Sequence, residues 1–470
     1  MIALTLAEVA SAVGGTVVGA STETVVRGSA FVDSRDVAAG GLFVAVAGEH
    51  VDGHDYAGQA IAGGAAAALV QREVGVPAVV VADPVHALGL LAHHVLSRLP
   101  SLRVVGITGS QGKTSTKDIV AQLLASSSGE TIAAAGSYNN EIGVPLTALR
   151  ATEATRFLVV EMGARGRGHV RDLAGMVRPV VGAVLNVGVA HIGEFGSQQG
   201  IARSKGELVE ALPSSGVAVL NADDEHVRAM ATRTAATVVL FGSSLDAGVR
   251  VDDIELDESG RLRCALEVDG VRQALSVPLV GEHHARNVAA AVAVALNCGV
   301  AFEAVPAVLA GLKQTSRWRM EMSTTASGLT IINDAYNANP DSMRAALQTL
   351  AAIGHRRRPD CRTFAVLGEM RELGEQSRDE HDAIGRLVVR LDIDQLVVVG
   401  QEARALHLGA CLEGSWDSES MFVPDVESAV SFVRATARAG DVVLVKASRA
   451  AGLERVALAL LVDDEGEPSR

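Results

Sequence analysis

A glycine-rich turn between a strand and a helix is the clearest chemical motif in this sequence. The turn follows the strand-like run 102–107. Its residues are Thr108, Gly109, Ser110, Gln111, Gly112, Lys113 and Thr114. Such a turn directs free backbone N–H groups and the positive helix end at one place, which suits a polyphosphate. Lys113 adds a charge for the β- and γ-phosphates, and the Thr114 hydroxyl can ligate Mg²⁺. The turn therefore predicts an ATP site. A plain strand-to-helix connection is the alternative, because the spacing is looser than Gly-x-x-x-x-Gly-Lys-Thr.

An acid, a histidine and a lysine elsewhere in the chain are candidates for the same site. Glu161 follows the apolar stretch 157–160, and His191 follows the stretch 184–190. Ligands of open α/β sheets gather at the carboxyl ends of strands, so both side chains are expected to face the phosphate turn. A structural role is the alternative for His191. Lys205, taken by itself, is expected to be a solvated helix lysine.

The elements that must position these residues alternate between strands and helices. Strands are expected at 157–160, 181–185 and 217–220, and a helix at 285–297. This alternation predicts an α/β fold with a parallel sheet covered by helices on both faces. Residues 249–277 instead alternate apolar and polar side chains around two turn sequences, which predicts a small antiparallel addition.

The length of the chain predicts three domains, because 470 residues exceed one compact core. We expect an N-terminal α/β domain at 1–99, a central P-loop ATPase-like domain at 100–315, and a Rossmann-like C-terminal domain at 316–470. The strands expected in the last domain lie near 330–332, 363–367, 395–399 and 442–445.

The composition argues against several classes of partner. The formal net charge is −14 and there is no long basic run, so we expect neither nucleic-acid nor anionic-membrane binding. The sequence begins without a basic and apolar leader and has no apolar run of roughly 18 residues, which predicts a soluble cytoplasmic protein without membrane insertion. We also expect a monomer. The four cysteines, Cys264, Cys298, Cys361 and Cys411, are widely separated, which predicts reduced and mostly buried thiols.

Several longer motifs resemble those of the Mur ligases, the ATP-dependent amide-forming enzymes of peptidoglycan synthesis. The phosphate turn has the Thr-Gly-x-x-Gly-Lys-Thr form of that family. The stretches 139–145, 161–164, 186–191, 334–343 and 367–374 resemble its dipeptide-adding MurF branch. The resemblance covers nearly the whole chain in the family's order. It implies that ATP and Mg²⁺ are used to join UDP-N-acetylmuramoyl-tripeptide to D-alanyl-D-alanine through an acyl phosphate. It also implies that the first domain binds the UDP-sugar, the second binds ATP, and the third closes over both.

The resemblance assigns roles to the metal-site candidates. Glu161 and His191 match metal positions of the family. Lys205 matches a lysine that CO₂ carbamylates, which would turn a cation into an anion that helps to hold magnesium.

The resemblance also assigns ligand contacts. Asn287 matches an adenine-contacting asparagine, Arg319 an arginine near the phosphates, and Asp334 an acid that contacts the ATP ribose. Substrate contacts are expected at Ser34, Arg35, Asn139, Asn140, Tyr336, Asn337, Asn339, Lys446 and Arg449. Arg35 stands beside Asp36, so a surface ion pair is its alternative role.

Three other functions share parts of this pattern. A sister Mur ligase that adds the third residue and a folylpolyglutamate-type synthase both use the ATP turn. The chain lacks the Asp-Asn-Pro-Arg motif of the former, and the segment around Asp33-Ser34-Arg35 would have no role in the latter. A catalytically silent nucleotide-binding protein is the third, because a fold does not prove activity. Lys113, Thr114, Glu161, His191 and Lys205 occur together, which favours an enzyme.

Overall fold

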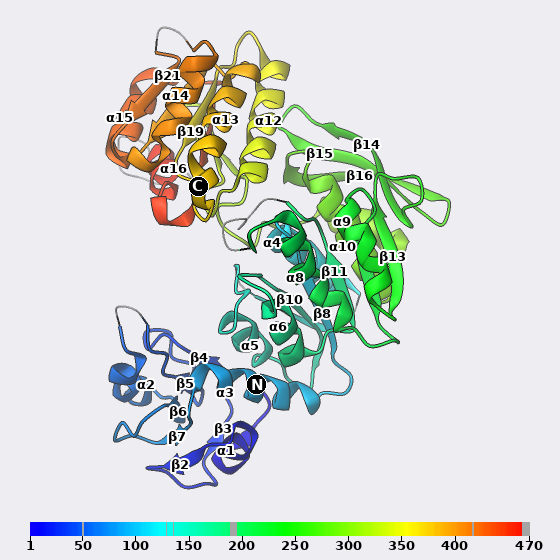
Figure 1. The fold of residues 1–470 in the computed structure, drawn as a ribbon, viewed down its shortest axis with the longest axis vertical. Helices are drawn as coiled ribbons and strands as arrows, with labels where there is room; N and C mark the ends of the chain where they lie inside the picture. The colour runs from blue at the N-terminus through cyan, green and yellow to red at the C-terminus, as the bar shows by residue number, and fades with distance from the viewer. Residues whose placement is uncertain (49–50, 128, 135, 189–194, 416–417, 463–470) are drawn as a thin grey trace.

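A computed structural model describes residues 1–48, 51–127, 129–134, 136–188, 195–415 and 418–462 of the chain. Their strands form a five-stranded N-terminal sheet, a nine-stranded central sheet and a six-stranded C-terminal sheet, besides one short two-stranded pair. Figure 1 shows the three units in a row, with the central sheet between the other two. Among the described residues, no helix is both long enough and apolar enough to cross a membrane.

The N-terminal sheet is small and mixed. Its strand order is β2-β7-β6-β5-β4, in which β2 runs antiparallel to β7 and the other neighbours are parallel. Its strands are β2 (Thr16–Val18), β4 (Ala30–Phe31), β5 (Leu42–Val44), β6 (Ala67–Val70) and β7 (Ala78–Val80). Beside them lie the pair β1 (Leu4–Thr5) and β3 (Val25–Val26) and the helices α1 (Leu6–Val13), α2 (Ala57–Ala62) and α3 (Pro84–Ser97). The unit is therefore α/β, as the sequence predicts.

The central sheet is mainly parallel, in the order β16-β15-β14-β13-β12-β11-β8-β10-β9. Its parallel strands are β8 (Arg103–Thr108), β9 (Glu130–Ala133), β10 (Thr155–Glu161), β11 (Val181–Val184), β12 (Val217–Asn221) and β13 (Thr237–Gly242). The antiparallel strands expected at 249–277 are β14 (Val249–Leu256), β15 (Arg261–Val268) and β16 (Val271–Val280). They extend the main sheet, because β14 pairs in parallel with β13 before the chain turns back.

Helices cover both faces of the central sheet, as predicted from the alternation of elements. They are α4 (Lys113–Ser126), α5 (Gly143–Ala148), α6 (His169–Val177), α8 (Gln198–Glu210), α9 (Glu225–Arg228), α10 (His284–Asn297) and α11 (Val305–Ala310). One core contains side chains of α4 and α10, such as Ile119 and Val288. The other contains side chains of α6 and α8, such as Leu173 and Leu208, together with Leu91 of α3. The last helix of the N-terminal unit is therefore anchored on the central unit.

The C-terminal sheet has the order β17-β18-β22-β19-β20-β21 and is parallel except for its edge strand β17. Its strands are β17 (Glu321–Thr324), β18 (Thr330–Asn333), β19 (Thr363–Leu367), β20 (Gln395–Val399), β21 (Ser420–Val423) and β22 (Val442–Lys446). Its helices are α12 (Pro340–Arg357), α13 (Ser377–Arg390), α14 (Arg404–Glu413), α15 (Val426–Thr436) and α16 (Glu454–Leu461). Helices α12 and α13 contribute to one core and α15 and α16 to another, which is the doubly wound arrangement expected for a Rossmann-like unit.

Candidate active site

The phosphate turn connects β8 to α4 at the carboxyl end of the central sheet. Asn186, which follows the neighbouring strand β11, shapes the turn: its Oδ1 accepts the backbone N–H groups of Ser110 and Gln111, each at 3.0 Å. Lys113 folds back over the turn, and its Nζ donates to the carbonyl oxygen of Gly109 at 2.7 Å. The turn thus places its lysine and the first N–H groups of α4 together, which is the arrangement that holds phosphates.

Helix α10 brings Asn287 and two histidines against this turn. Gly112 has a φ of +80°, and a Cβ there would lie 2.4 Å from Asn287 Oδ1, so only glycine fits. The rings of His283 and His284 lie with their centroids 4.2 Å apart and their planes tilted by 39°. Burial lowers the pKa of His283 to about 4 and that of His284 well below its usual value. Both imidazoles are therefore neutral near pH 7.

Thr114 lies at the centre of a polar network. It donates to Glu161 Oε2 at 2.8 Å, and the hydroxyl of Ser137 lies 2.8 Å from it. Asn139 donates to the other carboxylate oxygen of Glu161 at 2.7 Å. Glu161 is fully buried. Strand β10 thus delivers a carboxylate to the phosphate turn, as the sequence predicts.

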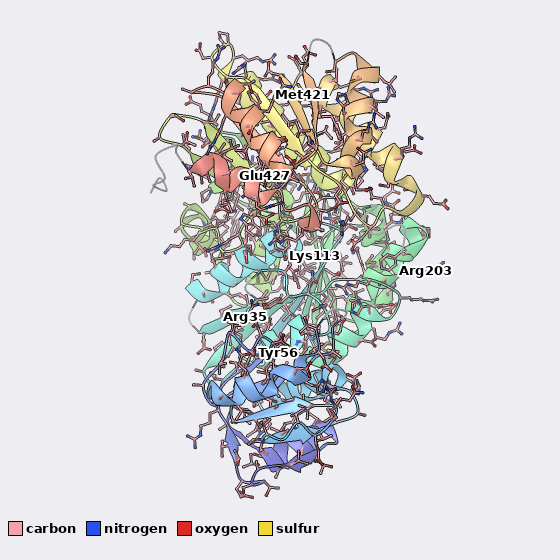
Figure 2. The ribbon with its side chains drawn as sticks, turned by 90° about the vertical axis from the view of Figure 1, so that its left-hand side faces the viewer. Arg35, Tyr56, Lys113, Arg203, Met421 and Glu427 are labelled. Carbon is pink, nitrogen blue, oxygen red and sulfur yellow. The ribbon has the colours of Figure 1, made fainter. Side chains whose placement is uncertain are left out.

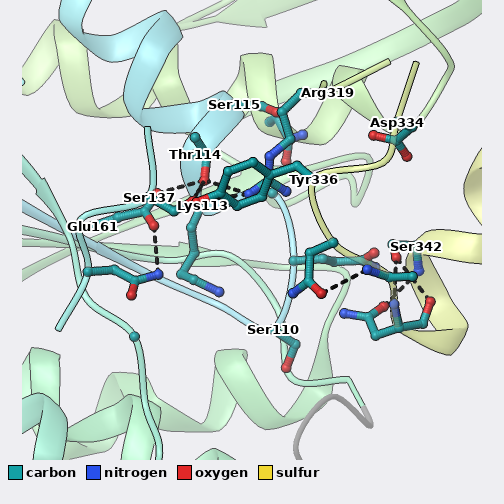
Figure 3. Close-up of a pocket in the computed structure, with 18 of the residues that line it drawn as sticks. Ser110, Lys113, Thr114, Ser115, Ser137, Glu161, Arg319, Asp334, Tyr336 and Ser342 are labelled. Atoms are coloured by element: carbon teal, nitrogen blue, oxygen red, sulfur yellow. Dashed lines mark hydrogen bonds between the residues drawn. The ribbon is translucent and has the colours of Figure 1, made fainter. Parts of the chain in front are cut away.

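Arg319 reaches this network from the segment that leads into the C-terminal sheet (Figure 3). Its Nη2 donates to Thr114 Oγ1 at 3.2 Å and to Ser137 Oγ at 3.1 Å. Its guanidinium also lies over the ring of Tyr336, 4.3 Å from the centroid. Burial lowers the pKa of Lys113; Glu161 opposes this effect and Arg319 adds to it. An anionic ligand would offset the mutual repulsion of these two cations.

Lys205 is buried rather than solvated. Its neighbours on α8 bind the start of α6 and the loop before it. Ser204 donates to the carbonyl of Gly166 at 2.9 Å, and Glu207 accepts the backbone N–H groups of Gly168 and Arg171 at 2.7 and 3.1 Å. Burial lowers the pKa of Lys205 well below its usual value, and the charge of Lys113 lowers it further. An amine whose neutral form is favoured is nucleophilic, which is the state that reaction with CO₂ requires.

Asp334 and Lys446 form a buried ion pair. The Nζ of Lys446 lies 2.5 Å from Asp334 Oδ2 and also donates to the carbonyl of Asn337 at 3.0 Å. The other Asp334 oxygen accepts the N–H of Met320 at 3.0 Å. The sequence predicts that Asp334 contacts the ATP ribose and that Lys446 contacts a substrate. In the structure, the two side chains bind each other and nearby backbone groups. Their predicted ligand contacts stay predictions.

Two predicted contact residues accept backbone N–H groups at the starts of helices. Asn140 Oδ1 accepts the N–H of Gly143 at 2.8 Å at the start of α5. Asn339 and Ser342 form a capping box at the start of α12. These caps hold the helix starts at the cavity, which is a structural use of the motif residues.

One cavity of about 310 Å³ collects most of the predicted residues (Figure 3). Those that line it are Ser110, Gln111, Gly112, Lys113, Thr114, Asn139, Asn140, Glu161, Lys205, Asn287, Arg319, Asp334, Tyr336, Asn337, Asn339 and Lys446. Thr108 and Gly109 belong to the turn but do not line the cavity. The Thr108 hydroxyl donates to the carbonyl of Met162 at 2.8 Å. His191 lies outside the described residues.

The remaining substrate candidates do not line this cavity. Arg449 pairs with Glu454 at 2.6 Å and lies over the ring of Trp318, 4.4 Å from its centroid. Arg449 thus lies outside the cavity, and its expected contact with a substrate carboxylate stays a prediction.

Ser34 and Arg35 lie on the N-terminal unit. Figure 2 shows Arg35 and Tyr56 a short way below Lys113, with most of the blue N-terminal unit below them. Arg35 pairs with Asp33 at 2.6 Å, not with Asp36 as considered from the sequence, and its side chain is 82% exposed. It is thus available to a phosphate in solvent, and the uridine-nucleotide contact stays a prediction.

Sequence reasoning missed several residues of the site. Ser137 carries no motif signal, yet it contacts both Thr114 and Arg319. Lys117 stands one turn after Thr114 on α4, is fully buried, and donates to the carbonyl oxygens of Ala134 (2.5 Å) and Gly136 (3.1 Å) in the loop before Ser137. A charged residue on the apolar face of the helix was the one available signal.

Comparison with known proteins gives the site a family. The model of the Mur ligase middle domain matches residues 107–295, that of the Mur ligase glutamate ligase domain 318–449, and that of the Mur ligase family catalytic domain 30–95. UDP-N-acetylmuramoyl-tripeptide--D-alanyl-D-alanine ligase from Mycobacterium bovis is 47% identical over 504 aligned positions, covering 99% of each chain. The chain belongs to the MurF branch of the Mur ligase family.

Two solved MurF structures have the same fold as this Mur ligase. A crystal structure of MurF from Acinetobacter baumannii is 30% identical, covers 97% of this chain and 98% of that chain, and has a TM-score of 0.85. MurF from Thermotoga maritima in complex with ADP is 29% identical, and the match covers 92% of this chain and 96% of that chain with a TM-score of 0.78. The predicted α/β fold and the resemblance to Mur ligases are therefore confirmed.

Proposed function

We propose that this Mur ligase joins D-alanyl-D-alanine to UDP-N-acetylmuramoyl-tripeptide and uses one ATP for each amide bond. The observation that carries the proposal is the contact of Arg319 with Thr114 and Ser137, which closes the C-terminal unit over the phosphate turn. This contact places the Tyr336–Asn339 motif of one unit and the phosphate turn of another on one cavity. The name of the Mycobacterium bovis relative gives the same two substrates.

The cavity has the features that ATP requires. Lys113 and the N-terminal end of α4 offer positive charge to phosphates. Arg319 Nε is buried and lacks a hydrogen-bond partner among the described residues, so it retains a donor for an oxygen of a ligand. A second cavity of about 240 Å³, lined by Gly112, Asn287, Phe241 and Arg286, adjoins the turn and suits the adenine base. We therefore place the adenine in the smaller cavity, and the phosphates and the ribose, whose expected partner is Asp334, in the larger one.

Amide formation needs a leaving group on the tripeptide carboxylate. Its oxygen attacks the γ-phosphorus, so an O–P bond forms and the bond to ADP breaks. The amine of D-alanyl-D-alanine then attacks the acyl carbon; the C–N bond forms, phosphate leaves with the C–O bonding pair, and the amine loses its proton. Lys113 and Arg319 offset negative charge on the transferring group. The closed C-terminal unit excludes water, which protects the acyl phosphate from hydrolysis.

The residues present also fit a magnesium ion. Mg²⁺ prefers oxygen ligands and usually takes one or two carboxylates together with substrate phosphates. Thr114 and Glu161 supply such oxygens beside the turn. Bound there, the ion would offset charge on the phosphates. We propose that Glu161, Thr114 and His191 belong to this site, and that a carbamylated Lys205 adds an anionic oxygen to it.

The three segments of the chain divide the substrates between them. We propose that residues 1–99 bind the UDP-sugar with Ser34 and Arg35, residues 100–315 bind ATP, and residues 316–470 hold the incoming amine. The cavity between the last two segments is where the third residue of the tripeptide meets the dipeptide.

The test is product formation with UDP-N-acetylmuramoyl-tripeptide and ATP, with D-alanyl-D-alanine or a single amino acid as the amine. ADP release and a UDP-linked pentapeptide that form only with the dipeptide would support the proposal. Turnover with a single amino acid alone would assign the chain to a sister ligase. Nucleotide binding without turnover would leave a silent nucleotide-binding protein.

A further inference from the structure

A glutamine of the phosphate-binding helix binds the linker between the central and C-terminal units. Gln122 lies on α4, and its side-chain amide contacts the backbone of Lys313 in both directions. Its Nε2 donates to the carbonyl of Lys313 at 2.9 Å, and its Oε1 accepts the N–H of Lys313 at 2.9 Å. The same Nε2 lies 3.2 Å from the carbonyl of Asp118, one turn earlier on the helix. Gln122 thus pairs with both the N–H and the C=O of Lys313, as the backbone of a neighbouring β-strand does.

The same linker then carries Arg319 to the phosphate turn. Arg319 lies six residues after Lys313, and its guanidinium contacts Thr114 in the first turn of α4. Helix α4 therefore receives the linker at two places, the backbone of Lys313 at Gln122 and the side chain of Arg319 at Thr114. A cavity of only about 30 Å³ separates the linker from the helix between these points.

The backbone on both sides of Arg319 is strained. Trp318 has a φ of +59° and Met320 a φ of +51°, values in the left-handed region that bulky residues rarely adopt. The surroundings hold them there: the N–H of Trp318 donates to Glu321 Oε2, and the N–H of Met320 donates to Asp334 Oδ1, each at 3.0 Å. Strained residues persist only where the surrounding structure holds them. Gln122, together with the buried Leu312, ties the start of this segment to the central unit.

We propose that Gln122 is a positioning residue that acts through Arg319. By fixing the backbone of Lys313 on α4, it sets the start of the linker so that Arg319 reaches Thr114 and Ser137. If Lys313 were released from α4, the backbone at Trp318 and Met320 could relax to negative φ. The Arg319 guanidinium would then move away from Thr114 and Ser137. This inference rests on the proposed ATP-dependent ligation, because Arg319 acts on the phosphates in that reaction.

A double-mutant cycle tests the proposal. The variants Gln122→Ala, Arg319→Ala and their combination are compared with the unmodified chain at saturating ATP, UDP-N-acetylmuramoyl-tripeptide and D-alanyl-D-alanine. A displacement of about 1 Å in a positioned group costs roughly 100-fold in rate, so we expect kcat to fall about 10- to 100-fold in Gln122→Ala. KM for the UDP-tripeptide should stay within about twofold. In the Arg319→Ala background the same change should lower kcat by less than about twofold, because interacting residues are not additive.

Two further measurements separate positioning from general destabilisation. Gln348→Ala is the matched control, since it removes an exposed glutamine from helix α12 and should leave kcat unchanged. Hydrogen–deuterium exchange should accelerate in residues 311–320 of Gln122→Ala and not in the strands of the central sheet.

The results have distinct meanings. A kcat of Gln122→Ala within about twofold of the unmodified chain, or an equal loss in both backgrounds, would overturn the proposal. Exchange that accelerates evenly across the central unit would overturn it as well. An unmodified chain that forms no pentapeptide would instead refute the proposed function.

Discussion

The ion pair between Asp334 and Lys446 yields a prediction whose size follows from the structure. Asp334→Asn leaves the Lys446 ammonium buried, with the carbonyl of Asn337 and a neutral amide as its partners. The two side chains are 12% and 2% exposed. Removing one partner of a buried ion pair costs roughly 3–5 kcal/mol, because an uncompensated charge stays inside the protein. Since one carbonyl contact remains, we expect the lower end, about 3 kcal/mol.

Calorimetry of the full chain measures this loss. For a unit of 150–250 residues, 1 kcal/mol shifts Tm by about 2–4 °C, so the transition of the C-terminal unit should fall by about 6–12 °C. The double variant Asp334→Asn with Lys446→Met should recover most of the loss, because methionine leaves no uncompensated charge inside the protein. A Tm within about 2 °C of the parent for Asp334→Asn would refute the reasoning. So would a double variant that is no more stable than the single one.

Four further predictions concern the cavity. Lys113→Ala should lower phosphate release by roughly 100- to 1000-fold, the usual cost of a group that stabilises transition-state charge, and near-parental turnover would exclude this role. Glu161→Gln should raise the Mg²⁺ concentration for half-maximal activity by roughly tenfold, measured by magnesium titration; an unchanged curve would remove Glu161 from the metal site. Gly112→Ala should weaken ADP binding by about tenfold or more in a fluorescence titration, since its Cβ would lie 2.4 Å from Asn287 Oδ1. The folded-state pKa of His283, about 4 instead of 6.5, predicts that the unfolded chain binds more protons between those values. The contribution of His283 to stability is therefore fully present above pH 6.5 and is lost as the pH falls toward 4. In His283→Gln, Tm should depend less steeply on pH between these two values than in the parent.

The sequence by itself determined the local parts of this protein. The alternation of apolar runs and helical stretches specified the parallel sheets, because each element buries its own periodic face. The turn between a strand and a helix was predictable from its residues Gly112, Lys113 and Thr114. The N–H groups that such a turn directs at one place belong to adjacent residues, so the local sequence specifies them. Glu161 was also predictable, because the carboxyl ends of neighbouring parallel strands meet at one edge.

Only the tertiary structure decided which partner each polar group has. Lys446 is separated from Asp334 by 112 residues and Arg319 from Thr114 by 205, so no local pattern records either contact. From the sequence, Lys205 is expected to be a solvated helix residue. In the structure it lines the cavity beside the phosphate turn, and burial lowers its pKa well below the usual value. A buried charge must find a partner nearby in space, and domain packing, not neighbouring sequence, supplies that partner.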